Sequence, residues 1–418
     1  MPTLHVLLPT LGSAGDVNPM VALAKEFRRR GHRATVITNE IFGDSIRAAG
    51  LDFVQLGTAA DVEAAIHDPR LWHPLKGFRC IAERMLLPNI APLYEIIASR
   101  AGPGIVVAAP ATCLGARVAQ EKLGVPLATV HLQPAVLRSL VDAGRPGRLT
   151  MGPGMPRLIK KSLFWMIDRF FVNPLLLPGV NEFRAGLGLA PVKDIFARYL
   201  HSPQLVIGLF PDWFAPPQPD WPPHTHLTGF VMEDRGGEPA AELDADEFIN
   251  AGQPPVVFTP GSATTGREKF FRESIEACRI AGLRAMLVTN FPEQLPAALP
   301  DFARAFGYVP FSRILPRCAA LVYHGGIGTL AQAIRAGIPH LVTPNAHDQP
   351  DNALRIERLG VGRTIYPERY RAASVARTLR EIIGSGEVRQ RCLDYAKRID
   401  SEESLRRTCE LIEQLALS

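Results

Sequence analysis

Hydrophobic and polar positions along the first half of the chain alternate between two patterns. Short apolar runs of four to six residues predict buried strands, and they fall at residues 5–9, 34–38, 53–56, 105–109, 127–131 and 205–210. Residues 17–30 and 112–123, which lie between such runs, carry apolar positions at helical spacing. Uniformly apolar strands that alternate with helices predict a parallel sheet covered on both faces.

A proline-rich segment separates this half from the second. The stretch "FAPPQPDWPPHTH", residues 214–226, holds five prolines, which remove backbone donors and disfavour helix. The alternation then resumes, with strands predicted at 256–259, 285–289, 319–323 and 340–343 and helices at 268–281, 330–336 and 350–359. The sequence therefore predicts an α/β protein with two Rossmann-like parallel-sheet domains. The expected divisions are a first domain 1–215 (with a helical excursion at 140–200), a linker 216–225, a second domain 226–395, and a terminal helix 396–418 that closes the second domain or packs back on the first.

The excursion at 140–200 interrupts the strand–helix alternation. Its stretch "MPRLIKKSLFWMIDRFFVNPLLLPG" is rich in large apolar side chains, among them Trp165 and Phe171, beside Lys160 and Lys161. The favoured interpretation is a helix that packs in the core. The alternatives are the wall of an apolar ligand pocket, which would make Trp165 and Phe171 acceptor-binding residues, and a surface helix that touches lipid.

Composition and charge narrow the class of protein. The formal charge is 46 − 41 = +5 over 418 residues, which suits an anionic small ligand or loose attraction to an acidic membrane face but is too weak for a nucleic-acid partner. The six cysteines show no CxxC pair and no metal-ligand spacing, so we expect reduced thiols in a cytoplasmic protein, with peripheral contact at the inner face of the membrane left open. We expect no signal peptide and, because no apolar run reaches about 18 residues, no membrane-spanning helix.

A glycine-rich turn in the second half has the features of a phosphate site. A buried strand ends at Tyr323, His324 follows, and Gly325, Gly326 and Gly328 open a helix expected to begin near Thr329. Glycines let the backbone approach an anion, and the helix N-terminus presents free N–H groups and the positive end of its dipole. A second predicted strand ends at Gly261 and Ser262, and ligands of open parallel sheets bind beyond such carboxyl ends.

These motifs resemble those of nucleotide-sugar-dependent glycosyltransferases of family 1, which have the GT-B fold of two Rossmann-like domains facing each other across a cleft. The resemblance covers essentially the whole chain, and its specific part is "HGGIGT…AGIP…P…HDQPDNA". The stretch "HSPQLVIGLFPDWFAPPQPDWPPHTHLTGF" is most similar to the rhamnosyltransferase of rhamnolipid synthesis, and more loosely to sterol glucosyltransferases.

The resemblance implies a role for each matching position. His324 and the amides of Gly326, Gly328 and Thr329 would hold the donor diphosphate with help from Ser262, and Asp348 and Gln349 would bind sugar hydroxyls. Tyr308 falls where plant members place a tryptophan that stacks on the base, which Val309 and Phe311 would frame. Gln332 departs from the glutamate that commonly grips both ribose hydroxyls, so UDP and dTDP donors both stay open.

The glycine-rich turn "LGSAGDVNPM" near the N-terminus carries a carboxylate, Asp16, which would repel a phosphate. Since the phosphate site lies in the second domain, the resemblance implies that Asp16 is the general base that deprotonates the acceptor hydroxyl during inverting transfer. The alternative is a helix N-cap with no catalytic role. His131 and Asp142 are further candidates for the base, although a satisfied core histidine is favoured for His131.

The function expected from these features is inverting transfer of a sugar to a hydroxyl of an apolar acceptor, which is a small molecule or a lipid. No cofactor and no metal are implied, because the helix dipole and His324 can stabilise the leaving diphosphate and no DxD-like acidic pair stands at a strand end. Two alternatives stay open: a nucleotide-sugar epimerase of the same fold, and a non-catalytic nucleotide-sugar binder or activator subunit.

Overall fold

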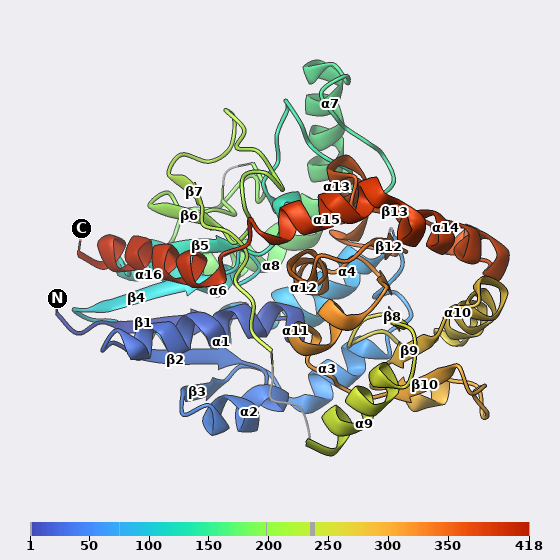
Figure 1. Ribbon diagram of the computed structural model, residues 1–418. Coiled ribbons are helices and arrows are strands. Elements are labelled where there is room, and N and C mark those ends of the chain that lie inside the picture. Colours follow the sequence, from blue (N-terminus) through green and yellow to red (C-terminus); the bar gives the residue numbers. More distant parts are fainter. Residues whose placement is uncertain (1, 75, 198, 235–238, 418) are drawn as a thin grey trace. The chain divides into compact units, whose positions relative to one another are not determined.

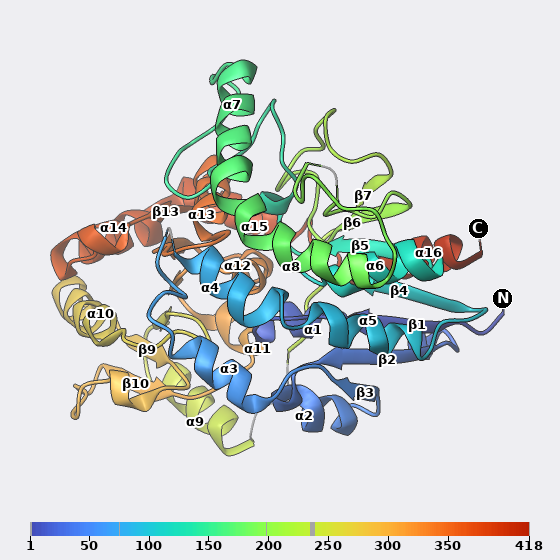
Figure 2. The same cartoon turned by 180° about the vertical axis from the view of Figure 1, so that it is seen from behind.

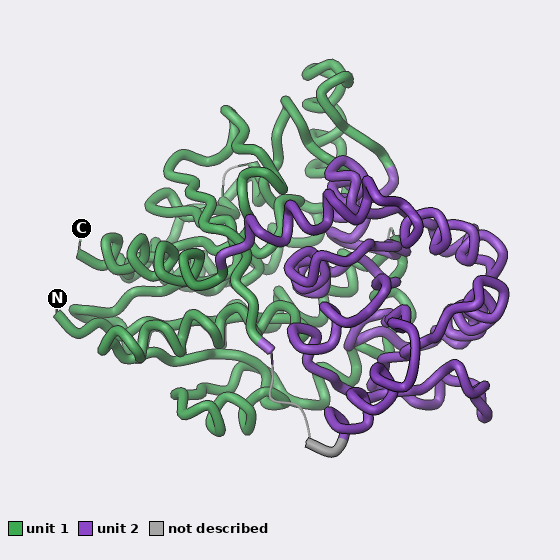
Figure 3. The backbone as a smooth tube through the Cα atoms, viewed as in Figure 1, with its two compact units in different colours: residues 1–145, 149–233, 401–418 green, residues 146–148, 234–400 purple. Residues whose placement is uncertain are grey.

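The chain divides into two compact units (Figure 3). The computed structural model describes residues 2–74, 76–197, 199–234 and 239–417. Unit 1 comprises residues 1–145, 149–233 and 401–418, and unit 2 comprises 146–148 and 234–400. Each unit is built on its own parallel sheet, and the predicted α/β fold with two Rossmann-like sheets is confirmed.

Unit 1 contains a seven-stranded sheet in the order β3-β2-β1-β4-β5-β6-β7, with every neighbouring pair parallel. Its strands are β1 (His5–Pro9), β2 (Arg33–Thr38), β3 (Asp52–Gln55), β4 (Ile105–Ala109), β5 (Leu127–His131), β6 (Leu205–Gly208) and β7 (Thr225–Leu227). The central strands are almost fully buried, as their apolar runs predict.

Helices cover both faces of this sheet (Figures 1 and 2). On one face α5, α6 and α8 share a buried cluster with residues of β1, β2, β4 and β5, while α1 and α16 pack together and lie against the same strands from the other side. The helices of unit 1 are α1 (Ala14–Arg29), α2 (Gly43–Ala48), α3 (Ala59–Ile66), α4 (Gly77–Ile81), α5 (Ile90–Ala98), α6 (Leu114–Leu123), α7 (Arg157–Ile167), α8 (Asn173–Gly186) and α16 (Ser401–Leu417).

The excursion in unit 1 forms one continuous helical segment, visible from behind in Figure 2. A π-helical turn, Asp168–Val172, joins α7 to α8. By length and composition alone, residues 157–186 could cross a membrane, so the expectation that no segment could do so is corrected. The second part of this segment, α8, is embedded in the core of unit 1 through Leu176 and Val180.

Unit 2 contains a six-stranded parallel sheet in the order β10-β9-β8-β11-β12-β13. Its strands are β8 (Val256–Thr259), β9 (Ala285–Val288), β10 (Ala303–Phe306), β11 (Ala320–Tyr323), β12 (His340–Val342) and β13 (Gly362–Thr364). Its helices are α9 (Pro239–Asn250), α10 (Glu268–Ala281), α11 (Phe311–Ile314), α12 (Ile327–Ala336), α13 (Gln349–Leu359), α14 (Ala372–Gly384) and α15 (Gly386–Ala396).

The division between the units falls later than the proline-rich linker expected at 216–225. The segment adds β7 to the sheet of unit 1, and the chain stays in that unit as far as Glu233. The terminal helix begins at Ser401 rather than 396 and belongs to unit 1. There Glu413 on α16 accepts hydrogen bonds from Arg30, at 2.6 and 2.7 Å, and Thr408 donates to the Thr228 hydroxyl at 2.8 Å.

Candidate active site

The predicted donor-binding residues gather at the carboxyl edge of the sheet in unit 2. Tyr308 follows β10, Ser262 follows β8, His324 follows β11, and Asp348 follows β12 at the start of α13. In a parallel sheet all these strand ends lie at one edge, which is where ligands of open α/β sheets bind.

The turn between β11 and α12 is shaped for close approach. Gly325 has φ +94°, and a Cβ there would lie 2.8 Å from Val342 Cγ1. Gly326 is the N-cap of α12, which begins at Ile327, two residues earlier than expected. The N–H groups of the first helical turn, including those of Gly328 and Thr329, have no acceptor within the helix and can bind an anion.

The His324 ring lies directly on two glycines. A Cβ on Gly326 would come within 2.4 Å of its Nε2, and a Cβ on Gly261 within 2.9 Å of its Cε1. Burial, with the nearby positive charge of Arg267, lowers the pKa of His324 to about 4. The imidazole is therefore neutral at neutral pH in the absence of donor, and a neutral imidazole can offer one N–H to a phosphate oxygen.

Arg267 is a residue that the sequence analysis missed. Its main-chain N–H donates to Gln294 Oε1 at 2.8 Å, which anchors the loop after Gly261. Its Nε is buried without a hydrogen-bond partner, and no carboxylate in the described part of the chain lies within ion-pair distance. Burial lowers the pKa of Arg267. A half-buried arginine that acts on His324, and whose Nε is buried without a partner, is a candidate ligand for an anionic group.

The loop after β12 is tied to the glycine turn by Asn352, another residue not singled out from the sequence. Its Nδ2 donates to the Gly325 carbonyl at 2.9 Å and to Asp348 Oδ2 at 2.7 Å. Gln349 is buried, and its Oε1 accepts from the N–H of Asn345 at 2.8 Å. Its side-chain oxygen therefore organises the loop, and its amide Nε2 is the group available for a sugar hydroxyl.

Gln332 is held in one orientation by an acidic residue. Its Nε2 donates to Asp234 Oδ1 at 2.8 Å, and the other carboxylate oxygen of Asp234 accepts from the Ser312 N–H at 2.9 Å. The Gln332 side chain is 8% exposed, and its Oε1 is buried with no hydrogen-bond partner. That oxygen is a single acceptor in need of a donor.

Two of the three residues expected at the base differ in accessibility. Tyr308 is 39% exposed, so its ring can stack on a ligand. Val309 is buried at 2% exposure, so its side chain lies in the protein interior and only its backbone could meet a nucleotide.

Asp16 in unit 1 lies just beyond the end of β1, in the first turn of α1. Ser13 is the N-cap and Asp16 occupies the third helical position, so Asp16 completes a capping box and is not itself the N-cap. The Ser13 N–H and hydroxyl donate to Asp16 Oδ2 at 2.8 and 3.2 Å, and neither bond engages Oδ1. Gly12 has φ +134°, and a Cβ there would lie 2.2 Å from Oδ2, so only glycine fits beside this carboxylate.

A second capping box in unit 1 provides a comparison. At the start of α3, the Thr58 N–H and hydroxyl donate to Asp61 Oδ2, both at 2.8 Å. These bonds lower the pKa of the exposed Asp61. For Asp16, burial raises the pKa above its ordinary value despite the opposing bonds from Ser13. The same hydrogen-bond motif therefore holds a poor base at Asp61 and a stronger base at Asp16.

The other acceptor-side candidates, His131 and Asp142, make contacts with residues other than Asp16. His131 is 2% exposed, and its Nε2 lies 3.0 Å from Nδ1 of His201. Burial, then the His201 charge, holds its pKa well below the ordinary value, which favours the satisfied core histidine. Asp142 Oδ1 accepts from the Gly144 N–H in the loop that begins the excursion.

Trp165 and Phe171 are on the surface, 60% and 69% exposed. The expectation of a core-packing helix is therefore right for α8 and for Val172 in the π-helical turn, and wrong for the outward-facing apolar side chains of α7 and that turn.

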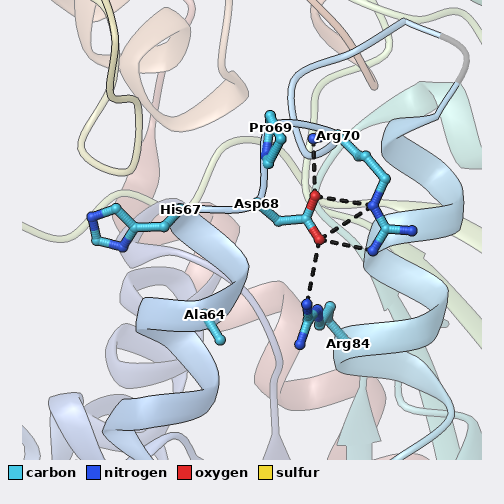
Figure 4. Close-up of a pocket in the computed structure, with 6 residues that line it drawn as sticks. All are labelled: Ala64, His67, Asp68, Pro69, Arg70 and Arg84. Atoms are coloured by element: carbon cyan, nitrogen blue, oxygen red, sulfur yellow. Dashed lines mark hydrogen bonds and ion pairs between the residues drawn. The ribbon is translucent and has the colours of Figure 1, made fainter.

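One surface hollow in unit 1 is lined by none of the predicted site residues (Figure 4). Its volume is about 540 Å³, and its lining includes His67, Asp68, Arg70 and Arg84. Asp68 is already paired with Arg70 at 2.7 Å and lies 3.6 Å from Arg84. We therefore assign it no part in the reaction. Among the described residues, no three His, Cys, Asp or Glu side chains form a group that could hold a metal ion.

Comparison with known proteins identifies the class of this molecule. Residues 6–141 match the "Glycosyltransferase family 28 N-terminal domain", and residues 280–412 match "Erythromycin biosynthesis protein CIII-like, C-terminal domain". The O-mycaminosyltylonolide 6-deoxyallosyltransferase of Streptomyces fradiae is 31% identical over 427 residues, covering 99% of this chain and 98% of that protein.

Two solved structures share the fold. The glycotransferase of kitacinnamycin has a TM-score of 0.74 at 17% identity, covering all of both chains. The spinosyn rhamnosyltransferase complexed with thymidine diphosphate has a TM-score of 0.67 at 18% identity, covering 98% of this chain and 100% of that one.

The chain belongs to the GT-B glycosyltransferases of the family 28 and erythromycin CIII-like type. It is a nucleotide-sugar-dependent glycosyltransferase. The matching family models are those of family 28 and the erythromycin CIII-like domain, whereas its motifs indicate family 1.

Proposed function

We propose that the enzyme is an inverting transferase that moves a hexose or deoxyhexose, such as rhamnose, from UDP or dTDP to a hydroxyl of an apolar acceptor. The acceptor classes that fit are polyketides, lipids, sterols and phenols. The similar Streptomyces fradiae protein is named for transfer of a 6-deoxyallosyl group to O-mycaminosyltylonolide, which supports a deoxysugar and a natural-product aglycone.

The observation that carries the proposal is the geometry of the Asp16 carboxylate just beyond β1, where the Ser13 N–H and hydroxyl both bind Oδ2 and neither bond engages Oδ1. Burial, which raises the pKa of Asp16, supports the same role. In the proposed reaction Asp16 takes the acceptor hydroxyl proton while that oxygen forms a bond to the anomeric carbon. The bond from this carbon to the diphosphate oxygen breaks on the opposite face, and the diphosphate leaves with the electron pair. Asp16 ends the step protonated, and the configuration at carbon is inverted.

Unit 2 would hold the donor through its carboxyl edge. The amides of Gly326, Gly328 and Thr329, the His324 imidazole and the Ser262 hydroxyl would bind the diphosphate, and Arg267 would add a positive charge. Asp348 and Gln349 would bind sugar hydroxyls. The base would stack on Tyr308, beside the Val309 backbone and Phe311.

For the nucleotide, we propose dTDP ahead of UDP. Gln332 offers one unpartnered oxygen, because its amide nitrogen is committed to Asp234. One oxygen suffices for the single 3′-hydroxyl of a 2′-deoxyribose, whereas a ribose would leave a second hydroxyl without this acceptor. The structural relative that binds thymidine diphosphate points the same way.

We also propose that the enzyme works in the cytoplasm, because its six cysteines are buried free thiols.

A donor and acceptor panel tests the function. UDP- and dTDP-sugars are mixed with lipid, sterol, polyketide and phenolic acceptors, and released nucleotide is measured with the anomeric configuration of the product. We expect release only when an acceptor is present, with inversion. Release without acceptor would indicate a hydrolase or epimerase, and no release from any combination would indicate a non-catalytic binder.

A further inference from the structure

The helix α7 has its polar and apolar faces reversed. A helix on a soluble protein normally buries its apolar stripe and exposes its charges. In α7 and the π-helical turn after it, the fully buried side chain of Lys160 and the buried carboxylate of Asp168 face the protein instead. The outer surface carries large apolar side chains: Leu158, Ile159, Trp165, Met166, Phe170 and Phe171.

The inward charges are held in place by specific partners. Lys160 Nζ donates to the Leu140 carbonyl at 3.1 Å and to that of Val141. Asp168 accepts from Arg138 Nη1 at 2.7 and 2.8 Å. The Arg138 guanidinium lies over the rings of Phe164 and Phe196, at 4.8 and 4.3 Å from their centroids. Rotating α7 to bury its apolar face would break these bonds and leave the Arg138 guanidinium without its carboxylate partner, so the outward apolar surface is fixed by the fold.

The charges around this surface share one sign. Between residues 143 and 181 the chain has six basic residues and a single acidic one, Asp168, which is buried and paired. Arg157, Lys161 and Arg169 are exposed among the apolar side chains, and Arg169 lies over the Phe170 ring at 5.7 Å. Exposed aromatic and aliphatic side chains mixed with Lys and Arg are the composition of helices that lie in a membrane interface.

We propose that residues 157–171 form a docking surface for a membrane rich in anionic lipid, with the helix lying in the headgroup region. The apolar side chains would enter the acyl boundary, and Arg157, Lys161 and Arg169 would bind lipid phosphates. A span is disfavoured because α8 is committed to the core of unit 1. A second copy of the chain suits the surface poorly, since a symmetric contact would bring Lys161 and Arg169 of both copies together without an acidic partner.

The test is vesicle flotation of the full chain with phosphatidylcholine vesicles, with and without phosphatidylglycerol. We expect binding to the anionic vesicles that weakens as salt is raised. The triple variant Leu158→Ser, Ile159→Ser, Phe170→Ser should lose at least about tenfold in vesicle affinity, since each side chain would no longer bury apolar area in the bilayer. Leu243→Ser on α9, where the leucine is 69% exposed, is the matched control and should bind like the parent.

The basic residues are tested separately. Lys161→Gln and Arg169→Gln should each lower affinity for anionic vesicles about fivefold, the equivalent of roughly 1 kcal/mol for one basic side chain at such a surface. The matched control is Lys269→Gln with Arg272→Gln, which removes two exposed basic residues from α10.

Fluorescence reports whether this surface itself meets the lipid. Anionic vesicles should shift tryptophan emission to shorter wavelength in the parent and in Leu243→Ser, and the shift should disappear in Trp165→Phe.

Two outcomes would overturn the proposal. One is equal vesicle binding by the triple variant and its control, with circular dichroism showing both folded. The other is no vesicle binding by the parent, together with a dimer or protein complex in light scattering that the triple variant loses. The occupant would then be a protein.

Discussion

Replacing Asp16 by Asn separates catalysis from helix capping at one position. Asparagine keeps an oxygen that can accept the Ser13 N–H bond, which is 2.8 Å long in the parent, but it cannot take a proton at neutral pH. Losing a general base should lower kcat about 10²- to 10⁴-fold, which is roughly 3–5 kcal/mol in the barrier. The capping loss should stay below about 1 kcal/mol in stability. The two effects therefore differ enough to be told apart.

The assay measures nucleotide release at saturating donor and acceptor, with melting temperature and donor affinity recorded for each variant. Asp61→Asn is the matched control, because it removes the same carboxylate from a capping box of the same geometry on α3. We expect similar small stability changes in both variants and a loss of kcat only in Asp16→Asn. Equal kcat in the two variants would refute the role of Asp16, and Asp142 would be tested next.

The pH profile gives a second measure of the same role. Burial raises the pKa of Asp16, and only its ionised form can accept a proton. The rate should therefore fall as pH decreases through this raised pKa. A parent profile that stays flat down to the range of an ordinary carboxyl would contradict the raised pKa.

Three further predictions concern the donor site. Gln332→Glu alone should weaken donor binding, because two carboxylates would meet where Gln332 now donates to Asp234 at 2.8 Å. Adding Asp234→Asn should restore donor binding and shift the preference toward UDP. Both effects are measured by titration calorimetry. His324 has a pKa of about 4 without donor, and a bound diphosphate should raise this pKa. The affinity for a nucleoside diphosphate should therefore increase from pH 7 to pH 5 more steeply in the parent than in His324→Gln. Parallel pH profiles of affinity in the two proteins would contradict this prediction. Arg267→Gln should lower affinity for dTDP about tenfold or more while leaving thymidine binding unchanged, whereas equal losses for both ligands would indicate a structural role for Arg267.

The long apolar strands were predictable from the sequence because each is a run that must be buried on both faces. The edge strands β7, β10 and β13 were not. They are three or four residues long, with the sequences "THL", "ARAF" and "GRT", and they join their sheets through backbone pairing that no continuous apolar run marks. The missed β7 also explains why the boundary between the units was placed too early.

The glycine turn, its histidine and the HDQPDN loop could be found because each motif is local in sequence. Their supporting contacts could not, since these join distant segments. Asp234 is 98 residues from Gln332, and Asn352, the last residue of the HDQPDN loop, is 27 residues from the Gly325 carbonyl it binds. Arg267 carries no motif of its own, and only the structure shows that its unpartnered Nε lies in a loop whose charge acts on His324.

The helix α7 shows why apolar periodicity alone misassigned its faces. Lys160, Phe164, Asp168 and Val172 are spaced four residues apart and lie on one face, so the sequence does group the two charges together. A core interpretation would turn that face to solvent. The deciding partners are Arg138 and the carbonyls of Leu140 and Val141, which precede the helix and satisfy both charges on its inner side. Turning the helix over would leave Arg138 and the two carbonyls without their partners beneath an apolar face, so these polar contacts determine the orientation and the apolar side chains face outward.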